Sequence, residues 1–398
     1  MEEVSMKKNH PFIAFGKPVF GEEEIKAVTE VLKSGWIGMG PKCIEFEQAF
    51  AQYVGSPFAV SVSSCTAALH LALAALDIGP EDEVITTPFT FVATVGAIEY
   101  VGARPVLVDI DPRTLNINPE LVERAITSKT KAIIPVHFGG LPCAMERLTG
   151  IAKKHGVAIV EDAAHAIGAR WRSTMIGGIQ GSIACFSFYP NKNITTIEGG
   201  MITTDSRTLA DKFTIMRLHG LDNEAWRRYN QGSQLTFSEA VMRGFKYNMT
   251  DVSAALGICQ LRKLEDFLTA RERYAEIYNQ YFVDLPCTIQ YQQTSTCTGD
   301  RHALHLYILT LDLEKLDTTR DAIVQEIRDN GIGATVHYRA IHLHPYFRRL
   351  GYLLGSLPHS ERISHSVITL PLTPSMSEED ATRVAQITRA VILRHQTS

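Results

Sequence analysis

The chain has 398 residues, of which 45% are hydrophobic and 21% are charged, and its formal net charge at pH 7 is -4. This length is more than one hydrophobic core usually supports, so we expect a large domain and a smaller one. The charge gives no electrostatic reason for a nucleic-acid partner. The longest apolar run, Ala67 to Leu76, is too short for a membrane span, and the N-terminus lacks the apolar segment of a secretory signal. We therefore expect a cytoplasmic protein that acts on a small molecule.

Short apolar runs alternate with helical patterns from residue 82 onward. The apolar runs are 83–87, 105–110, 131–138 and 157–162, and the helical patterns between them are 91–102, 119–127 and 145–156. This alternation predicts successive βαβ units. The sequence therefore predicts an α/β fold with a mostly parallel sheet that helices cover on both faces.

Two further apolar runs, 183–188 and 200–205, follow without a helix between them. We expect them to be neighbouring strands, joined by the segment that contains Lys192. A long helical pattern then runs from Val252 to about Leu285, and the remaining segments indicate a small α+β domain.

We place the domain boundary inside this long helical pattern. The prediction is a large domain over 1–265 and a small C-terminal domain over 266–398. The segment 291–300, which is rich in Gln, Thr and Gly, is expected to be a surface turn.

Seven scattered cysteines without a C-x-x-C pair suit reduced thiols better than disulfides or a zinc site. His337, His342 and His344 lie close together in the sequence, but no carboxylate near them would support a metal ligand. We therefore expect no metal centre.

Asp162 ends the predicted strand 157–162. Open α/β sheets bind ligands at the carboxyl ends of their strands. Taken alone, Asp162 would more often be a helix N-cap or a solvated strand end. Lys192 follows after one crossover and one strand, so both side chains can enter the same crevice.

Hydroxyl side chains precede an Ala- and Leu-rich helical pattern at Ser63, Ser64 and Thr66. Free N–H groups and hydroxyls at a helix N-terminus bind phosphate well, but an ordinary N-cap is equally compatible with this segment. The glycine-rich segment 35–42 matches neither the Walker spacing nor the dinucleotide-binding spacing.

A lysine, an acid and a phosphate cradle together indicate pyridoxal 5'-phosphate (PLP). The aldehyde of PLP reacts with a lysine, its ring nitrogen needs a carboxylate to stay protonated, and its phosphate needs N–H and hydroxyl donors. In a desolvated crevice beside a cationic cofactor, we expect the lysine pKa to fall by several units.

Several segments resemble the motifs of the DegT/DnrJ/StrS family of PLP-dependent nucleotide-sugar aminotransferases. The resemblance covers roughly Pro18 to Ile392 and implies the aspartate aminotransferase fold, type I. It rests on VSSCTAALHLAL, PFTFVATVGAIEYVGARPVLVDID, VEDAAHAIGA, FSFYPNKNITTIEGGM, RLHGL, KYNMTDVSAALG and GATVHYRAIHLHPYF.

By this resemblance, Lys192 is the lysine that binds the cofactor aldehyde and then transfers protons as general base and acid. Asp162 matches the aspartate that pairs with the pyridine nitrogen, and His165 matches the position beside the phenolic oxygen. Phe91 falls where an aromatic ring stacks on the pyridine face. Taken alone, Phe91 would more often be a core aromatic residue.

The resemblance also implies the phosphate ligands. Cys65 and Thr66 match the turn that holds the phosphate, and Ser187 matches a further ligand, although alone it would more often be a hydrogen-bonded inner residue. Asn248 corresponds to a phosphate contact from the neighbouring subunit, which implies a homodimer.

Two positions near the expected sugar pocket, His337 and Tyr338, are candidate substrate contacts. One departure from the family pattern is Ile197, which stands where a glycine is common, so the loop after the lysine is expected to be less permissive in φ or more apolar.

The resemblance implies transfer of the amino group of glutamate, released as 2-oxoglutarate, to a nucleotide-diphosphate keto-sugar, with the C4 carbonyl of a UDP-4-keto sugar favoured. The C3 carbonyl of a dTDP-sugar is an alternative. A PLP-dependent sugar dehydratase and a PLP-binding regulator without catalysis are further alternatives, but relatives that act as dehydratases replace the lysine by histidine.

Overall fold

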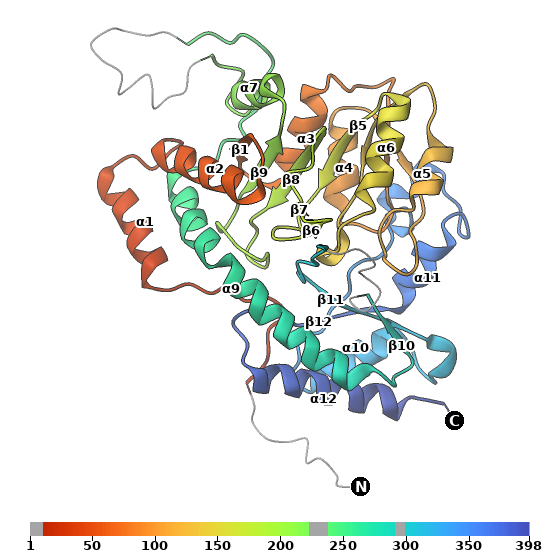
Figure 1. The fold of residues 1–398 in the computed structure, drawn as a ribbon. Helices are drawn as coiled ribbons and strands as arrows, with labels where there is room; N and C mark the ends of the chain where they lie inside the picture. Colours follow the sequence, from red (N-terminus) through yellow and green to blue (C-terminus); the bar gives the residue numbers. More distant parts are fainter. Residues whose placement is uncertain (1–10, 223–237, 291–298, 398) are drawn as a thin grey trace.

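A seven-stranded sheet forms the centre of the larger part of the molecule, where Figure 1 labels four of its strands, β1, β9, β8 and β5. The strand order is β1-β9-β8-β5-β4-β2-β3. The structure is a computed structural model, and it describes residues 11–222, 238–290 and 299–397. In this sheet β2, β3, β4, β5 and β8 are parallel, whereas β9 pairs antiparallel with β8 and with β1. The strands are β1 (Phe58–Val62), β2 (Glu83–Thr86), β3 (Arg104–Leu107), β4 (Thr130–Ile134), β5 (Ala158–Asp162), β8 (Ser182–Ser187) and β9 (Gly200–Thr204).

Side chains that alternate along the strands enter two separate hydrophobic clusters, one on each face of the sheet. Val160 of β5 joins a cluster with α3 (Cys65–Ala75), α4 (Val92–Tyr100) and α7 (Arg207–Met216). Its neighbour Ile159 joins a cluster with α2 (Pro41–Val54), α6 (Met145–His155) and α9 (Asp251–Phe282). This alternation is the period of a pleated strand buried on both faces. The predicted α/β fold with a mostly parallel, doubly covered sheet is confirmed.

The predicted helices and strands are present, and two of the predicted strands, 105–110 and 131–138, run three and four residues beyond the ends of the observed strands. The run 131–138 ends as a strand at Ile134 because Pro135, which follows, has no N–H group to donate to the sheet. The run 105–110 ends as β3 at Leu107. The larger part contains α1 (Glu22–Ser34), α2 (Pro41–Val54), α3 (Cys65–Ala75), α4 (Val92–Tyr100), α5 (Pro119–Ala125), α6 (Met145–His155), α7 (Arg207–Met216), the 3₁₀ turn Phe138–Gly140, and a small hairpin of β6 (Arg170–Trp171) and β7 (Thr174–Met175).

One long helix, α9 (Asp251–Phe282), connects the two parts of the molecule (Figure 1). Its N-terminal half contributes to the cluster under the large sheet, through residues that include Leu264 and Leu268. Residues from Tyr274 onward, among them Tyr278 and Phe282, contribute to a second cluster with the C-terminal elements. The predicted boundary at 265/266 lies inside α9 and stays a prediction.

The C-terminal part is a three-stranded antiparallel sheet packed against helices. The sheet has the order β10-β11-β12. Its elements are β10 (Cys287–Ile289), β11 (Tyr307–Leu311), α10 (Arg320–Asp329), α11 (Pro358–Ser366), β12 (Val367–Leu370), α12 (Glu378–Arg394) and the 3₁₀ turns Leu313–Lys315, Ile341–Leu343 and Tyr346–Leu350.

The predicted pairing of 183–188 with 200–205 is confirmed, since β8 and β9 are antiparallel neighbours. The predicted surface turn at 291–300 falls almost entirely outside the described residues. Within the described ranges, none of the helices combines the length and apolar character that crossing a bilayer requires.

Candidate active site

A cavity of about 380 Å³ opens where the carboxyl ends of β5 and β8 meet the N-termini of α3 and α4. Its volume is typical of a small-molecule site. Nine of the ten predicted site residues line this one cavity, although they come from segments far apart in the chain. These nine are Cys65, Thr66, Phe91, Asp162, His165, Ser187, Lys192, His337 and Tyr338.

Lys192 lies on the loop that joins β8 to β9, and its backbone N–H donates to Tyr189 O at 2.9 Å. Burial of its ammonium group in the cavity wall lowers the lysine pKa to about 8, although Cys65 and Asp162 oppose this shift. The direction agrees with the prediction from the sequence. An amine with this pKa is partly neutral near physiological pH, so Lys192 can act as a nucleophile and as a base.

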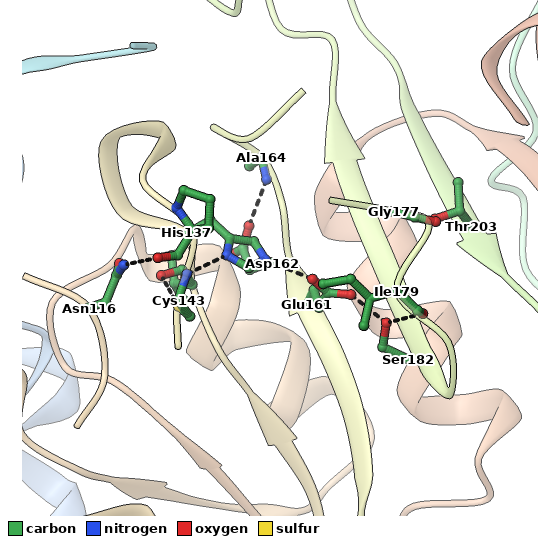
Figure 2. Close-up of polar contacts among 12 residues, drawn as sticks. Asn116, His137, Cys143, Glu161, Asp162, Ala164, Gly177, Ile179, Ser182 and Thr203 are labelled. Carbon is green, nitrogen blue, oxygen red and sulfur yellow. Dashed lines mark hydrogen bonds and ion pairs between the residues drawn. The ribbon is translucent and has the colours of Figure 1, made fainter. Parts of the chain in front are cut away.

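Asp162, the last residue of β5, is 6% exposed. Its Oδ2 accepts a hydrogen bond from Thr94 Oγ1 at 2.7 Å. Its Oδ1 accepts one from Ala164 N at 3.2 Å (Figure 2). Burial raises the pKa of the carboxyl group, whereas these two donors and Lys192 lower it. A buried carboxylate of this kind is stabilised by a cationic ligand.

The contact with Thr94 is a feature that the sequence analysis missed. Thr94 lies in the first turn of α4, three residues after Phe91, and its hydroxyl also contacts Thr90 Oγ1 at 2.8 Å. A hydroxyl near a helix N-terminus, in the same segment as a predicted site residue, was the signal available in the sequence.

His165 and Tyr338 form a polar pair on the cavity wall. His165 Nδ1 accepts from Gly139 N at 3.3 Å, so in the neutral ring Nε2 carries the proton and faces Tyr338 Oη at 3.3 Å. Burial lowers the pKa of His165 well below its usual value and raises the pKa of Tyr338. Both groups are therefore neutral near pH 7, so His165 can donate a hydrogen bond without adding charge.

His337 belongs to the same wall. Its Nδ1 lies 3.1 Å from Thr369 Oγ1, and burial lowers its pKa to about 3. His342 and His344 face elsewhere, toward Glu361 and the carbonyl of Arg339. In the part of the chain that the structure describes, no group of three or more His, Cys, Asp or Glu side chains is arranged to hold a metal ion.

The N-terminus of α3 forms the other end of the cavity. Ser64 Oγ accepts from Ala67 N at 3.1 Å, so Ser64 is the N-cap, and it also lines the cavity with Cys65 and Thr66. The two interpretations of this segment, an ordinary N-cap and a phosphate-binding turn, are therefore compatible. A Cβ on Gly200 would lie 2.6 Å from the Ser64 carbonyl carbon, so only glycine lets β9 approach this turn so closely. Backbone N–H groups and the helix dipole favour an anion here.

Two more predicted residues complete the lining. Phe91 is 57% exposed and is therefore not a core residue; its ring centroid lies 6.1 Å from that of Tyr338. Ser187 lies at the end of β8. The roles of both residues in binding a cofactor stay predictions.

Asn248 is the one predicted site residue that the chain does not bring to this cavity. It lines a separate hollow of about 370 Å³ with Trp36 and Lys246. Its Oδ1 accepts from Lys246 Nζ at 2.6 Å, and its Nδ2 donates to Met249 O at 3.1 Å. Its predicted contact with the phosphate of a neighbouring subunit concerns a second chain and stays a prediction.

Ile197, the departure from the family pattern, has a φ of 71°. This left-handed conformation suits glycine and is strained for a β-branched residue. The position therefore keeps the backbone conformation that a glycine would adopt, and the isoleucine side chain is 56% exposed.

The chemistry of this cavity fits PLP. It combines an amine with a lowered pKa, a buried carboxylate with room for a cationic partner, a neutral imidazole and an anion-binding helix N-terminus. Lys192 would hold the aldehyde carbon, Asp162 the ring nitrogen, and the turn at Cys65 and Thr66 the phosphate.

Comparisons with known proteins agree with this chemistry. Residues 18–389 match the model of the DegT/DnrJ/EryC1/StrS aminotransferase family. The chain is 44% identical over 389 residues to the spore coat polysaccharide biosynthesis protein SpsC of Bacillus subtilis, covering 97% of this chain and 98% of SpsC.

Solved structures give the same result. The PMP form of the putative sugar aminotransferase Spr1654 from Streptococcus pneumoniae superposes with a TM-score of 0.88 at 33% identity, covering 96% of this chain and 99% of Spr1654. PseC of Helicobacter pylori, an aminotransferase involved in pseudoaminic acid biosynthesis, superposes with a TM-score of 0.87 at 28% identity, covering 97% of this chain and 100% of PseC.

Proposed function

This chain belongs to the DegT/DnrJ/EryC1/StrS aminotransferase family, and from that premise we propose that it transfers the amino group of glutamate to a keto carbon of a nucleotide-activated sugar. The family and its solved members make the chain a sugar aminotransferase with PLP as its cofactor and fold type I as its architecture. What we propose is the identity of the amino-group donor and of the sugar that accepts the amino group.

One observation carries the proposed chemistry: Lys192 and Asp162 line the same cavity, with the lysine pKa lowered to about 8. Bound PLP supplies an electron-accepting ring next to the carbon whose proton is moved. The neutral amine of Lys192 would act as the base that takes this proton from the substrate carbon and then as the acid that delivers it to the aldehyde-derived carbon of the cofactor. Asp162 would keep the ring nitrogen protonated by supplying a buried negative charge.

The remaining polar groups hold the reactants in place. His165 donates from Nε2 toward the position beside the ring, and its neutral state avoids competition with the cationic ring nitrogen for Asp162. The N-terminus of α3, with Cys65 and Thr66, fixes the phosphate. His337 and Tyr338 also line the cavity, and we propose them as substrate contacts.

The proposed acceptor is the C4 carbonyl of a UDP-4-keto sugar. SpsC is described as a polysaccharide biosynthesis protein and PseC as an enzyme of pseudoaminic acid biosynthesis, which supports a role in making amino sugars for cell-surface polysaccharides. The C3 carbonyl of a dTDP-sugar is the second candidate, because amination at C3 needs the same lysine, acid and phosphate cradle.

We further propose a cytoplasmic homodimer, in which Asn248 reaches the phosphate of the other subunit's cofactor. Asn248 lies outside the cavity of its own chain, at a hollow of about 370 Å³, which is compatible with a role toward a second copy.

A two-step assay tests this function. Purified holoenzyme is first mixed with excess glutamate, and the visible absorbance of the lysine-bound cofactor should give way to the shorter-wavelength band of pyridoxamine phosphate, with release of 2-oxoglutarate. UDP-, dTDP- and GDP-linked 4-keto and 3-keto sugars are then added one at a time. A product that has exchanged its keto oxygen for an amino group identifies the acceptor.

Each alternative predicts another result. A sugar dehydratase would release water from its sugar without adding nitrogen, which the product mass reveals. A PLP-binding regulator would keep the absorbance of the lysine-bound form in the presence of glutamate. Either result would overturn the proposed amino-group transfer.

A further inference from the structure

A fully buried cluster lies behind Asp162, on the other face of the sheet. Glu161 precedes Asp162 on β5, and consecutive residues of a strand point to opposite faces. Glu161 is therefore directed away from the cavity, and it is 0% exposed. Carboxylates are rarely buried without partners, so the contacts of Glu161 need an explanation.

Glu161 connects the elements on both sides of β5. Its Oε2 lies 2.8 Å from His137 Nε2, on the segment after β4, and its Oε1 lies 2.5 Å from Ser182 Oγ, at the start of β8 (Figure 2). His137 is also 0% exposed. The two oxygens of one side chain thus link β5 to both of its neighbours.

The orientation of the His137 ring is fixed from its other side. Nδ1 accepts a hydrogen bond from Cys143 N at 3.0 Å, so in the neutral ring the proton is on Nε2 and is donated to Glu161 (Figure 2). Both ring nitrogens of His137 therefore have partners, and one orientation of the side chain satisfies both contacts.

The backbone of the same segment holds Asp162 itself. His137 N donates to Asp162 O at 3.2 Å, and Asp162 N donates to Pro135 O at 2.9 Å. His137 therefore contacts Asp162 through its backbone and Glu161 through its imidazole, so two separate contacts hold the end of β5. Two residues later, Gly139 N donates to His165 Nδ1. The segment that binds Glu161 thus positions both Asp162 and His165.

We propose that Glu161 and His137, with Ser182, are positioning residues that fix the Asp162 carboxylate at the distance and angle needed by the ring nitrogen of PLP. We call these three residues the Glu161 clamp. The orientation of a carboxylate at the end of a strand depends on the backbone that carries it. The Glu161 clamp holds this backbone from the opposite face of the sheet.

The test compares three variants. Glu161→Ala removes the clamp, leaves His137 Nε2 without its partner, and leaves Ser182 Oγ with the Ile179 carbonyl, to which it can donate at 2.9 Å (Figure 2). Glu161→Gln keeps it, since the amide oxygen can accept from His137 while the amide nitrogen donates to Ser182 Oγ. Thr203→Val is the matched control, because Thr203 is also 0% exposed on this sheet and donates to Gly177 O at 2.8 Å, away from Asp162 (Figure 2).

The principal readout is the affinity of cofactor-free protein for PLP, measured by titration, with the Tm of the cofactor-free protein recorded alongside. We expect Glu161→Ala to bind PLP on the order of tenfold more weakly, because a lost second contact of a ligand-holding group typically costs this much. Glu161→Gln should stay within about threefold of the wild type, since it restores both hydrogen bonds. Thr203→Val should lower the Tm without changing the PLP affinity.

If Glu161→Ala does not fold, Ser182→Ala replaces it, because that variant removes one of the two contacts with little change in volume. It should weaken PLP binding by roughly threefold. The proposal is overturned if Glu161→Ala, or Ser182→Ala in its place, behaves as Thr203→Val does, with a lower Tm and wild-type PLP affinity. It is also overturned if Glu161→Gln binds PLP as weakly as Glu161→Ala. Wild-type protein titrated in parallel shows that PLP binding itself is intact.

Discussion

Thr94 Oγ1 donates a hydrogen bond of 2.7 Å to Asp162 Oδ2, joining the first turn of α4 to the end of β5. Both groups are buried, at 0% and 6% exposure. The contact fixes one carboxylate oxygen in orientation and favours its charged form, against the effect of burial on its pKa. It links the strand that carries the acid to the helix that follows Phe91.

Asp162→Asn keeps the shape of the side chain but removes its charge. We expect kcat/KM for amino transfer to fall by roughly 100-fold or more, because the ring nitrogen of the cofactor loses its buried anionic partner. Thr94→Val keeps the carboxylate and removes one donor, so a loss of about tenfold is expected. Steady-state kinetics with glutamate measure both effects, and an Asp162→Asn variant with wild-type kcat/KM would contradict the assignment.

Lys192→Ala should remove covalent attachment of PLP and abolish amino transfer, because Lys192 is the only lysine among the described residues that line the cavity. Borohydride reduction of the wild-type holoenzyme should add the mass of one cofactor to the peptide that contains Lys192. The same treatment of the variant should add none. Labelling of another lysine in the wild type would refute this role.

The lowered pKa of Lys192 predicts a pH-dependent stability of the cofactor-free protein. The lysine pKa is about 8 in the folded chain, and its ordinary value, 10.5, applies in the unfolded chain. Between these values the unfolded chain therefore binds more protons than the folded chain. For this group, stability therefore rises as pH rises from about 8 to about 10.5. Below pH 8 the lysine is charged in both states and its full destabilising effect is present.

Lys192→Met provides the comparison for that effect, since methionine does not titrate. The variant should be more stable than the wild type near pH 7, and this advantage should shrink as pH increases through the window. Urea unfolding of both proteins at several pH values measures the difference in the free energy of unfolding. A difference that stays constant from pH 7 to 10 would show that the lysine pKa is not lowered.

Asn248→Ala should weaken cofactor binding if the residue completes the site of a second subunit. In a mixed dimer of Lys192→Ala and Asn248→Ala chains, both substitutions would then fall on the same site. The other site would keep both Lys192 and Asn248. Mixing the two variants under conditions of subunit exchange should add about a quarter of the wild-type activity, because about half of the dimers are mixed and each of these has one intact site. No recovery in dimers shown to exchange would mean that Asn248 acts within its own chain or not at all.

Ile197→Gly should stabilise the protein by about 1 kcal/mol, because glycine adopts a φ of 71° without the strain of a β-branched side chain. Val283→Gly is the control: Val283 is also β-branched and exposed, but its φ is -59°. That variant should lose about 0.5–1 kcal/mol. Chemical denaturation measures both, and a destabilised Ile197→Gly would indicate that the exposed isoleucine makes a contact that outweighs its strain.

Much of this protein follows from local sequence. The alternation of short apolar runs and helical patterns predicted the doubly covered sheet, because side-chain period and turn residues act over a few neighbours. The pattern around Asp162 and Lys192 predicted that an acid and a lysine enter one crevice, since Asp162 ends β5 and Lys192 lies on the loop after β8, the neighbouring strand.

The tertiary structure alone decided what surrounds those residues. Thr94 and the Glu161 clamp are contacts between segments distant in sequence, and neither strand period nor helix propensity specifies which side chains meet across a sheet. The lysine pKa of about 8 likewise depends on how completely the assembled walls exclude water. Short-range patterns set the elements and their order, whereas long-range packing sets the charge and orientation of the groups that carry out the chemistry.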